Sequence, residues 1–180
     1  MIYLYTDLTK KGLSDYQIKK KVNNCELYMV KKGVYSTTKE FDYLDYIAHK
    51  HPNAVFTLTT ACHCYGFLKN DKNPYYIATK QKDRKINDDN VKQIFMTTCL
   101  YNIGISKITY HGFNILIYDL ERLLIEVVRY KAQLSYDDYH EIIGSYRKIA
   151  KLLNKNKINN YVLNFKDKRI MERINNEVFQ

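Results

Sequence analysis

The most regular pattern of hydrophobic and polar positions follows a short apolar run at residues 113–118. The apolar positions recur at the spacing of one helix face: Leu120, Leu123, Leu124, Val127 and Val128. Asp119 and Glu121 lie where the first turn would be, and acidic residues there suit the positive end of a helix dipole. The pattern predicts an amphipathic helix that ends near residue 131, in which Arg122 and Glu126 can pair one turn apart.

The N-terminal part of the chain predicts a small unit built from short elements. These are an extended run at 1–5, a helix ending near Gly12, a helix at 15–23 capped by Ser14, and strands at 27–30 and 34–36. Helix, turn, helix and hairpin in this order are typical of a winged helix-turn-helix. Because few residues precede the first helix, where this fold has a further helix, we expect an abbreviated unit or a strand in that place.

The remainder of the chain predicts a mixed domain that ends in helices. The expected helices are 41–50, 57–66, 119–131 and 136–153; the expected strands are 53–57, 75–79, 93–98, 106–110 and 113–118. The polar run 154–157 is expected to break the long C-terminal helix, and two short helical patterns follow it. The sequence therefore predicts an α+β protein with two domains, at residues 1–38 and 39–180.

Composition narrows the classes of protein that fit. The chain has 180 residues with 46% hydrophobic residues, which excludes general disorder. It contains no long apolar run and no signal-peptide pattern, so we expect a cytoplasmic protein without a membrane partner. Its four cysteines do not form a disulfide framework at this length. The net charge of +10 favours a polyanionic partner without identifying it.

Basic and polar residues of the N-terminal unit are the candidates for DNA contact. They are Tyr16, Gln17, Lys19, Lys20 and Lys21 on the second helix, and Lys31 and Lys32 at the hairpin turn. Lysines contact phosphates, and Gln17 could contact an adenine edge in the major groove. The alternative is that the consecutive lysines are the solvated face of a surface helix.

A second group of basic residues lies in the C-terminal helical region. Its members are Arg147, Lys148, Lys151, Lys155, Lys166, Lys168, Arg169 and Arg173. They could form a binding face of the second domain, or they could be solvated helix surfaces.

Evidence for catalysis or metal binding is weak. The triplet Cys62-His63-Cys64 is expected on a helix, where neighbouring side chains point in different directions and cannot converge on one zinc ion. No glycine-rich phosphate loop or hydrolase motif is present. Asp119 and Glu121 could be magnesium ligands of a nuclease, although helix capping already explains them. We predict no enzyme activity, no cofactor and no metal.

Three segments resemble the AbiEi family, the antitoxins of type IV abortive-infection toxin–antitoxin systems. They are the hairpin 30–35, VKKGVY; the segment 51–67, HPNAVFTLTTACHCYGF; and the segment 117–129, IYDLERLLIEVVR. The third is the most specific, and in it Asp119, Glu121, Arg122 and Arg129 match the family pattern. The chain has Leu123 where the family commonly has Thr, and Glu126 where Asp is common.

The resemblance implies a fold and a function. Such proteins pair a winged helix with an α/β antitoxin domain, repress their operon by binding inverted repeats in promoter DNA, and counteract a co-encoded nucleotidyltransferase toxin. We therefore expect an antitoxin and autorepressor that is a monomer or a weak dimer. The alternative is an interaction protein that neutralises the toxin without binding DNA.

Overall fold

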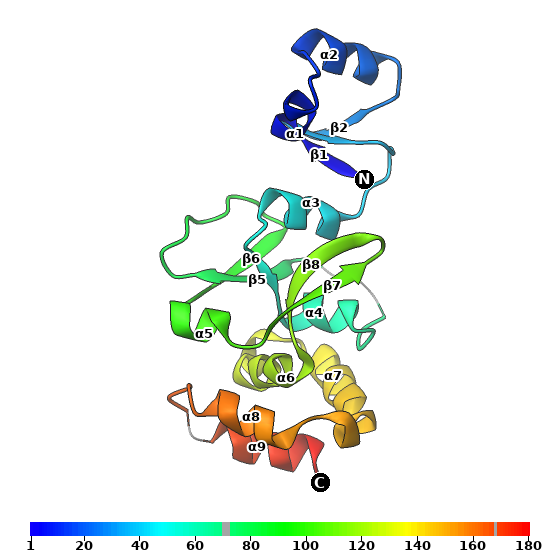
Figure 1. Cartoon of the computed structure of the whole chain (residues 1–180). Coiled ribbons are helices and arrows are strands. Elements are labelled where there is room, and N and C mark those ends of the chain that lie inside the picture. Colours follow the sequence, from blue (N-terminus) through cyan, green and yellow to red (C-terminus); the bar gives the residue numbers. More distant parts are fainter. Residues whose placement is uncertain (70–72, 168) are drawn as a thin grey trace. The chain divides into compact units, whose positions relative to one another are not determined.

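The computed structural model describes residues 1–69, 73–167 and 169–180, and its fold is α+β as predicted (Figure 1). The chain divides into two compact units, Met1–Asn53 and Ala54–Gln180. The sequence-based boundary after residue 38 thus differs from the division in the structure. Residues 39–53 belong to the first unit because the buried Asp45 carboxylate accepts a hydrogen bond from the Ile2 amide, at 3.2 Å.

The first unit contains a three-stranded antiparallel sheet and helices on the connections. Its elements are β1 (Ile2–Leu4), α1 (Tyr5–Lys10), α2 (Asp15–Asn23), β2 (Tyr28–Lys31), β3 (Val34–Ser36) and α3 (Tyr43–Lys50). The strand order is β1-β3-β2, so the N-terminal strand pairs with the second strand of the hairpin. The extended run expected at the N-terminus is therefore a strand of this sheet.

A small apolar cluster holds the first unit together. Leu8 of α1, Ile18 of α2 and Leu27 after it are buried against one another. Burying each of these side chains contributes about 1.5–3 kcal/mol. The cluster joins the two helices to the hairpin, so the orientation of α2 depends on its apolar face and its polar face is left outside.

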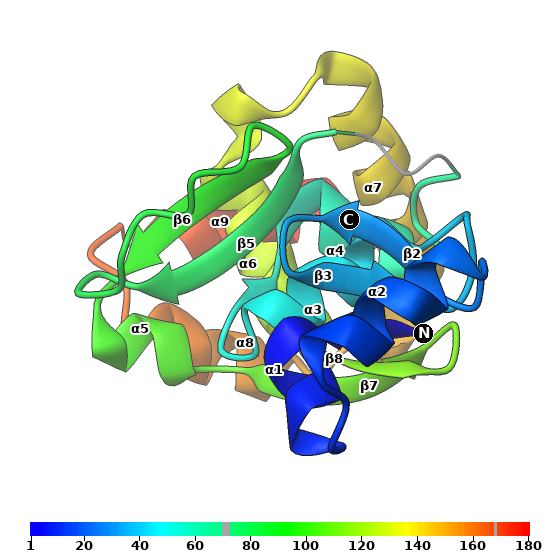
Figure 2. The same ribbon diagram turned by 90° about the horizontal axis from the view of Figure 1, so that it is seen from above.

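The second unit contains a mixed five-stranded sheet. Its strands are β4 (Val55–Phe56), β5 (Tyr75–Lys80), β6 (Val91–Met96), β7 (Ile105–Tyr110) and β8 (Phe113–Tyr118), in the order β6-β5-β4-β8-β7. The pairs β5–β6 and β4–β8 are parallel; β4–β5 and β7–β8 are antiparallel. Figure 2 shows β5 and β6 side by side, with the short helix α5 (Thr98–Asn102) following β6.

The helices of the second unit form layers against this sheet (Figure 1). They are α4 (Leu58–Cys64), α6 (Leu120–Arg129), α7 (Tyr136–Lys148), α8 (Lys155–Val162) and α9 (Ile170–Val178), with short 3-10 turns at η1 (Lys131–Gln133) and η2 (Ala150–Leu152). Helix α6 contacts α4, α8 and α9. Its residues 122–128 are all buried, including the charged ones, so α6 is the centre of the unit.

Two local predictions need correction. The helix expected at 136–153 ends at Lys148 and is followed by the turn η2, so residues 154–157 do not break it. They begin α8 instead: the Asn154 side chain accepts a hydrogen bond from the Lys157 amide, at 3.1 Å. An Asn at this position satisfies an amide that the first turn leaves unpaired. Helix α5 is absent from the sequence-based prediction, because five residues are too few for a visible hydrophobic period.

Candidate functional site

The start of α2 is held by a reciprocal pair of hydrogen bonds. The Ser14 hydroxyl accepts from the Gln17 amide at 3.3 Å, and the Gln17 side-chain oxygen accepts from the Ser14 amide at 2.8 Å. This capping box satisfies two backbone donors at the helix end. A bidentate contact with adenine would need the same Gln17 oxygen as an acceptor for the base amino group. In this geometry the Gln17 oxygen already accepts one hydrogen bond within the cap, so Gln17 positions the start of the helix.

The other candidate residues of α2 fall into two groups. Tyr16, Lys19 and Lys20 are exposed, and the Tyr16 side chain is 75% accessible. Lys21 instead forms an ion pair with Glu26, with Nζ 2.6 Å from the carboxylate, and this contact lowers the pKa of Glu26. The exposed surface of α2 therefore includes an aromatic ring and two ammonium groups.

The two hairpin lysines have different surroundings. Lys31 is half-buried: its Nζ donates to the Tyr43 hydroxyl at 2.5 Å and lies 4.8 Å from the centre of the Tyr46 ring. Lys32 lies in the turn between β2 and β3 and is exposed. The hairpin tip thus presents Lys32, and Lys31 packs on α3.

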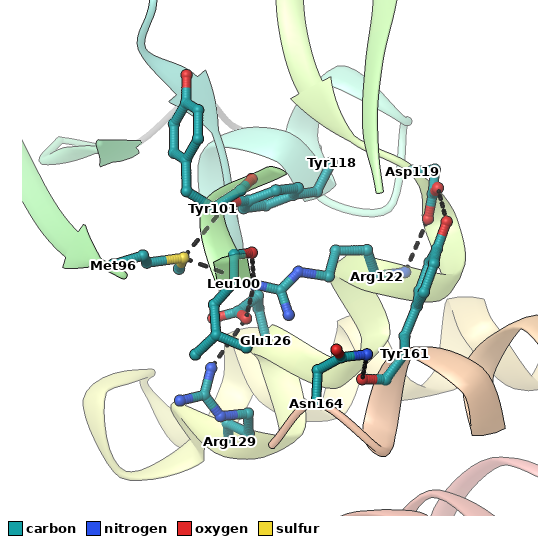
Figure 3. Close-up of polar contacts among 10 residues, drawn as sticks. All are labelled: Met96, Leu100, Tyr101, Tyr118, Asp119, Arg122, Glu126, Arg129, Tyr161 and Asn164. Carbon is teal, nitrogen blue, oxygen red and sulfur yellow. Dashed lines mark hydrogen bonds and ion pairs between the residues drawn. The ribbon is translucent and has the colours of Figure 1, made fainter. Parts of the chain in front are cut away.

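In the second unit, Arg122 lies at the centre of a buried cluster of polar and aromatic groups (Figure 3). Its guanidinium is 4.7 Å from the Tyr118 ring centre and 4.6 Å from that of Phe165, so it contacts both rings. Its Nη2 donates to the Leu100 carbonyl at 3.1 Å and pairs with Glu126 at 2.8 Å. The i, i+4 pair predicted from spacing is confirmed, but spacing gave no indication of its burial.

Glu126 is shared between two arginines. Its Oε1 lies 2.8 Å from Arg122 Nη2 and 2.9 Å from Arg129 Nη1, while the Arg129 guanidinium stacks 4.4 Å from the Phe165 ring centre. Two cations around one buried carboxylate give a net positive cluster. Phe165, from the segment after α8, covers both guanidinium groups.

Asp119 and Glu121 lie at the start of α6 and bind α8. Asp119 Oδ1 accepts from the Arg122 amide at 2.8 Å, and its Oδ2 accepts from the Tyr161 hydroxyl at 2.9 Å. Lys157 Nζ lies 3.2 Å from Asp119 and 3.0 Å from Glu121. Burial alone would raise the pKa of Glu121, but hydrogen bonds from Asn154 and Lys157 lower it.

These contacts account for the carboxylates as structural groups. The Lys157 ammonium group contacts both Asp119 and Glu121, and the Tyr161 hydroxyl contacts Asp119. Among residues 1–69, 73–167 and 169–180, no group of three or more His, Cys, Asp and Glu side chains could hold a metal ion. Burial raises the pKa of Cys62, and this thiol lies in the core as a small apolar group.

The predicted basic residues of the C-terminal helices do not form one face. Arg169 and Arg173 pair with Asp167, at 3.8 Å and 3.2 Å. Lys148 and Lys166 are exposed, and Lys168 lies outside the described residues. The remaining three line a single hollow: Arg147, Lys151 and Lys155. Sequence reasoning did not identify Lys157, Tyr161 and Phe165, because their roles depend on α8 packing beside α6.

The sequence matches no known family model and no curated protein. In the described part of the chain, every helix is too short or too polar to cross a bilayer.

Proposed function

We propose that this chain is a DNA-binding antitoxin of the AbiEi type. Its first unit would be a winged helix-turn-helix in which α2 is the recognition helix and the β2–β3 hairpin is the wing. The element order and the pairing of β1 with β3 support this interpretation, because they place a helix-turn-helix pair and a hairpin on one small sheet. The strand β1 stands where a winged helix has a further helix, so the unit would be an abbreviated form of the fold.

The single observation that carries the DNA-binding role is the exposed face of α2. Tyr16, Lys19 and Lys20 are exposed, with Tyr16 and Lys20 on the side opposite the buried Ile18, and Lys32 lies at the hairpin tip. The lysines would neutralise phosphates, and the Tyr16 ring, near the helix N-terminus, would contact bases or thymine methyl groups. Lys21, Lys31 and Gln17 would act within the unit by fixing α2 and the hairpin.

The antitoxin role rests on the resemblance of segments 30–35, 51–67 and 117–129 to the AbiEi family. The third segment supplies the start of α6 and its buried charges, which suits a motif that maintains the antitoxin domain. The partners would be inverted repeats in promoter DNA and a co-encoded nucleotidyltransferase toxin. The protein would act in the cytoplasm, as a monomer or a weak dimer.

A charge-reversal pair tests the DNA-binding face. The double variant Lys19→Glu, Lys20→Glu should lose binding to the DNA upstream of its gene in a gel-shift titration. The control double variant Lys82→Glu, Lys85→Glu changes net charge equally at exposed positions of the second unit and should retain it. Equal losses in both variants would mean that α2 has no special role and that binding follows net charge alone.

An interaction protein without DNA binding is the second candidate. It is favoured by the internal contacts of Gln17, Lys21 and Lys31, which leave a small polar face on α2. Co-expression with the toxin separates the two candidates. If the wild-type chain rescues growth but shifts no upstream DNA, the second candidate replaces the first.

A further inference from the structure

The C-terminal helices border an open hollow of about 400 Å³ that the proposed DNA-binding role does not use. It lies where the end of α7, the turn η2 and the start of α8 meet the end of α9. Its lining residues are Arg147, Ala150, Lys151, Lys155, Val178, Phe179 and Gln180. Pockets for small molecules have volumes of about 300–1,000 Å³, so the hollow is large enough for one.

The charged side chains that line the hollow are all positive. Arg147, Lys151 and Lys155 line it, and its lining contains no acidic side chain. The nearby Glu177 carboxylate contacts the Tyr139 hydroxyl and lies 3.3 Å from Lys131, so a cation outside the hollow balances it. Three cations around one space favour a ligand that carries more than one negative charge.

Two of the cations are held in place by the protein. Arg147 Nε donates to the Glu177 carbonyl at 2.6 Å, which fixes one edge of the guanidinium. Lys155 Nζ lies 4.1 Å from the centre of the Phe179 ring and is held over it. An arginine fork whose orientation is fixed suits a phosphate, because the planar donors match two phosphate oxygens.

The rest of the lining is apolar. Val178 is buried, Ala150 and Phe179 are half-buried, and they provide a wall beside the cations. A simple inorganic anion would leave this wall without a contact. A ligand with a phosphate group and a flat, partly apolar body would use both the cations and the wall.

We infer that this hollow binds a nucleoside phosphate. The phosphates contact Arg147, Lys151 and Lys155, and the nucleoside lies along Ala150, Val178 and the Phe179 side chain. The inference goes beyond the proposed function, since it concerns the second unit and does not depend on DNA binding by α2.

Calorimetric titration of the full chain with ADP, pyrophosphate and adenosine tests the inference. ADP should bind at least about tenfold more tightly than either fragment, because only ADP contacts both the cations and the apolar wall. No binding of ADP would overturn the inference. Pyrophosphate binding as tight as that of ADP would also overturn it, since the site would then recognise the anion only.

Paired variants locate the site. Lys151→Gln with Lys155→Gln should weaken ADP binding about tenfold or more, because charge-assisted contacts are lost. Lys148→Gln with Lys166→Gln removes the same charge from exposed positions that do not line the hollow and should leave ADP affinity unchanged. Equal weakening by both pairs would contradict the assignment. Lys19→Glu with Lys20→Glu should still bind ADP, so failure of the DNA-binding proposal is distinguishable from failure of this one.

Discussion

Among the described residues, Arg122 is the largest side chain that is fully buried. A buried guanidinium is tolerable only when charge and ring contacts replace water. Glu126 supplies the charge, and the Tyr118 and Phe165 rings contact the cation. Among the described residues, Arg122 Nε, Arg122 Nη1 and Glu126 Oε2 have no hydrogen-bond partner, so Arg122 depends strongly on its ion pair with Glu126.

Removing Glu126 should therefore be costly. Glu126→Ala leaves Arg122 buried without its carboxylate, and breaking a buried pair from one side typically costs about 3–5 kcal/mol. Urea unfolding followed by circular dichroism measures the loss. Glu172→Ala, at an exposed position of α9, is the control and should cost less than about 0.5 kcal/mol. Similar midpoints for the two variants would contradict the role given to the pair.

A second prediction at the residue scale concerns the stability loss on replacing Gly104. Its φ is +75°, and a Cβ added there would lie 2.5 Å from Arg122 Cβ. Gly112 has a φ of +88° with nothing within 4 Å of an added Cβ. Both alanine variants should lose about 1–2 kcal/mol through backbone strain, but Gly104→Ala should lose about 1–3 kcal/mol more through the clash. Equal losses in thermal unfolding would contradict close packing of this strand start on α6.

At the scale of elements, some side chains of α2 hold the helix in place and others form its exposed side. The Ser14–Gln17 capping box fixes where the helix begins, and Ile18 fixes which side faces the apolar cluster. The exposed side is then a consequence of these two constraints. Any DNA contact by α2 consequently depends on a cap whose residues need not contact the DNA.

Substitutions of Gln17 test this separation. Gln17→Glu keeps an acceptor for the Ser14 amide, so stability should stay within about 0.5 kcal/mol, while the added negative charge should weaken DNA binding. Gln17→Ala removes the cap contact and should cost about 0.5–2 kcal/mol. Sequence selectivity should be retained in Gln17→Ala protein that remains folded. Loss of selectivity in that variant, measured by competition with shuffled DNA, would make Gln17 a base-contacting residue.

Local signals in the sequence predicted many of these elements. Ser14 and Ser135 cap helices as expected, and the hairpin strand Phe113–Tyr118 has the predicted ends. Burial of Arg122 could not be predicted, because it depends on Phe165, which lies far along the chain. The contacts of Lys21 and Lys31 could not be predicted either, because a run of lysines does not indicate which ammonium groups have partners.

At the scale of the whole molecule, buried tyrosines predict a stability limit in alkali. Burial raises the pKa of Tyr65, Tyr118, Tyr139 and Tyr146, so each strongly favours its neutral form in the folded state. A group with a raised folded-state pKa contributes stability below its unfolded pKa, about 10 for Tyr, and loses it as pH rises towards the folded value. The melting temperature should therefore fall steadily above about pH 10.

Two variants test whether buried tyrosine hydroxyls cause the fall in melting temperature at alkaline pH. Tyr146→Phe removes a fully buried ionisable group and should make the alkaline fall shallower, although loss of the hydrogen bond to the Leu120 carbonyl lowers stability at pH 7. Tyr16→Phe, at an exposed position, should leave the pH dependence unchanged. A melting temperature that stays constant to pH 11 would show that burial of these hydroxyls is not linked to unfolding.

Binding of DNA through net charge alone differs from binding through charges at fixed positions in how it depends on salt and on DNA sequence. A chain with a net charge of +10 attracts any nucleic acid at low salt, because neutralised phosphates release counterions. Specific binding instead requires contacts from a fixed surface, which the proposal assigns to α2 and the hairpin tip. Salt concentration and DNA sequence must therefore be varied together to separate the two.

The most direct measurement is a gel-shift titration of the wild-type chain on the DNA upstream of its gene, against a shuffled duplex, at about 50 mM and 200 mM salt. The proposal predicts weaker binding to both duplexes at the higher salt, with a clear preference for the upstream DNA at both concentrations. Equal affinity for the two duplexes, lost at the higher salt, would contradict a DNA-reading first unit.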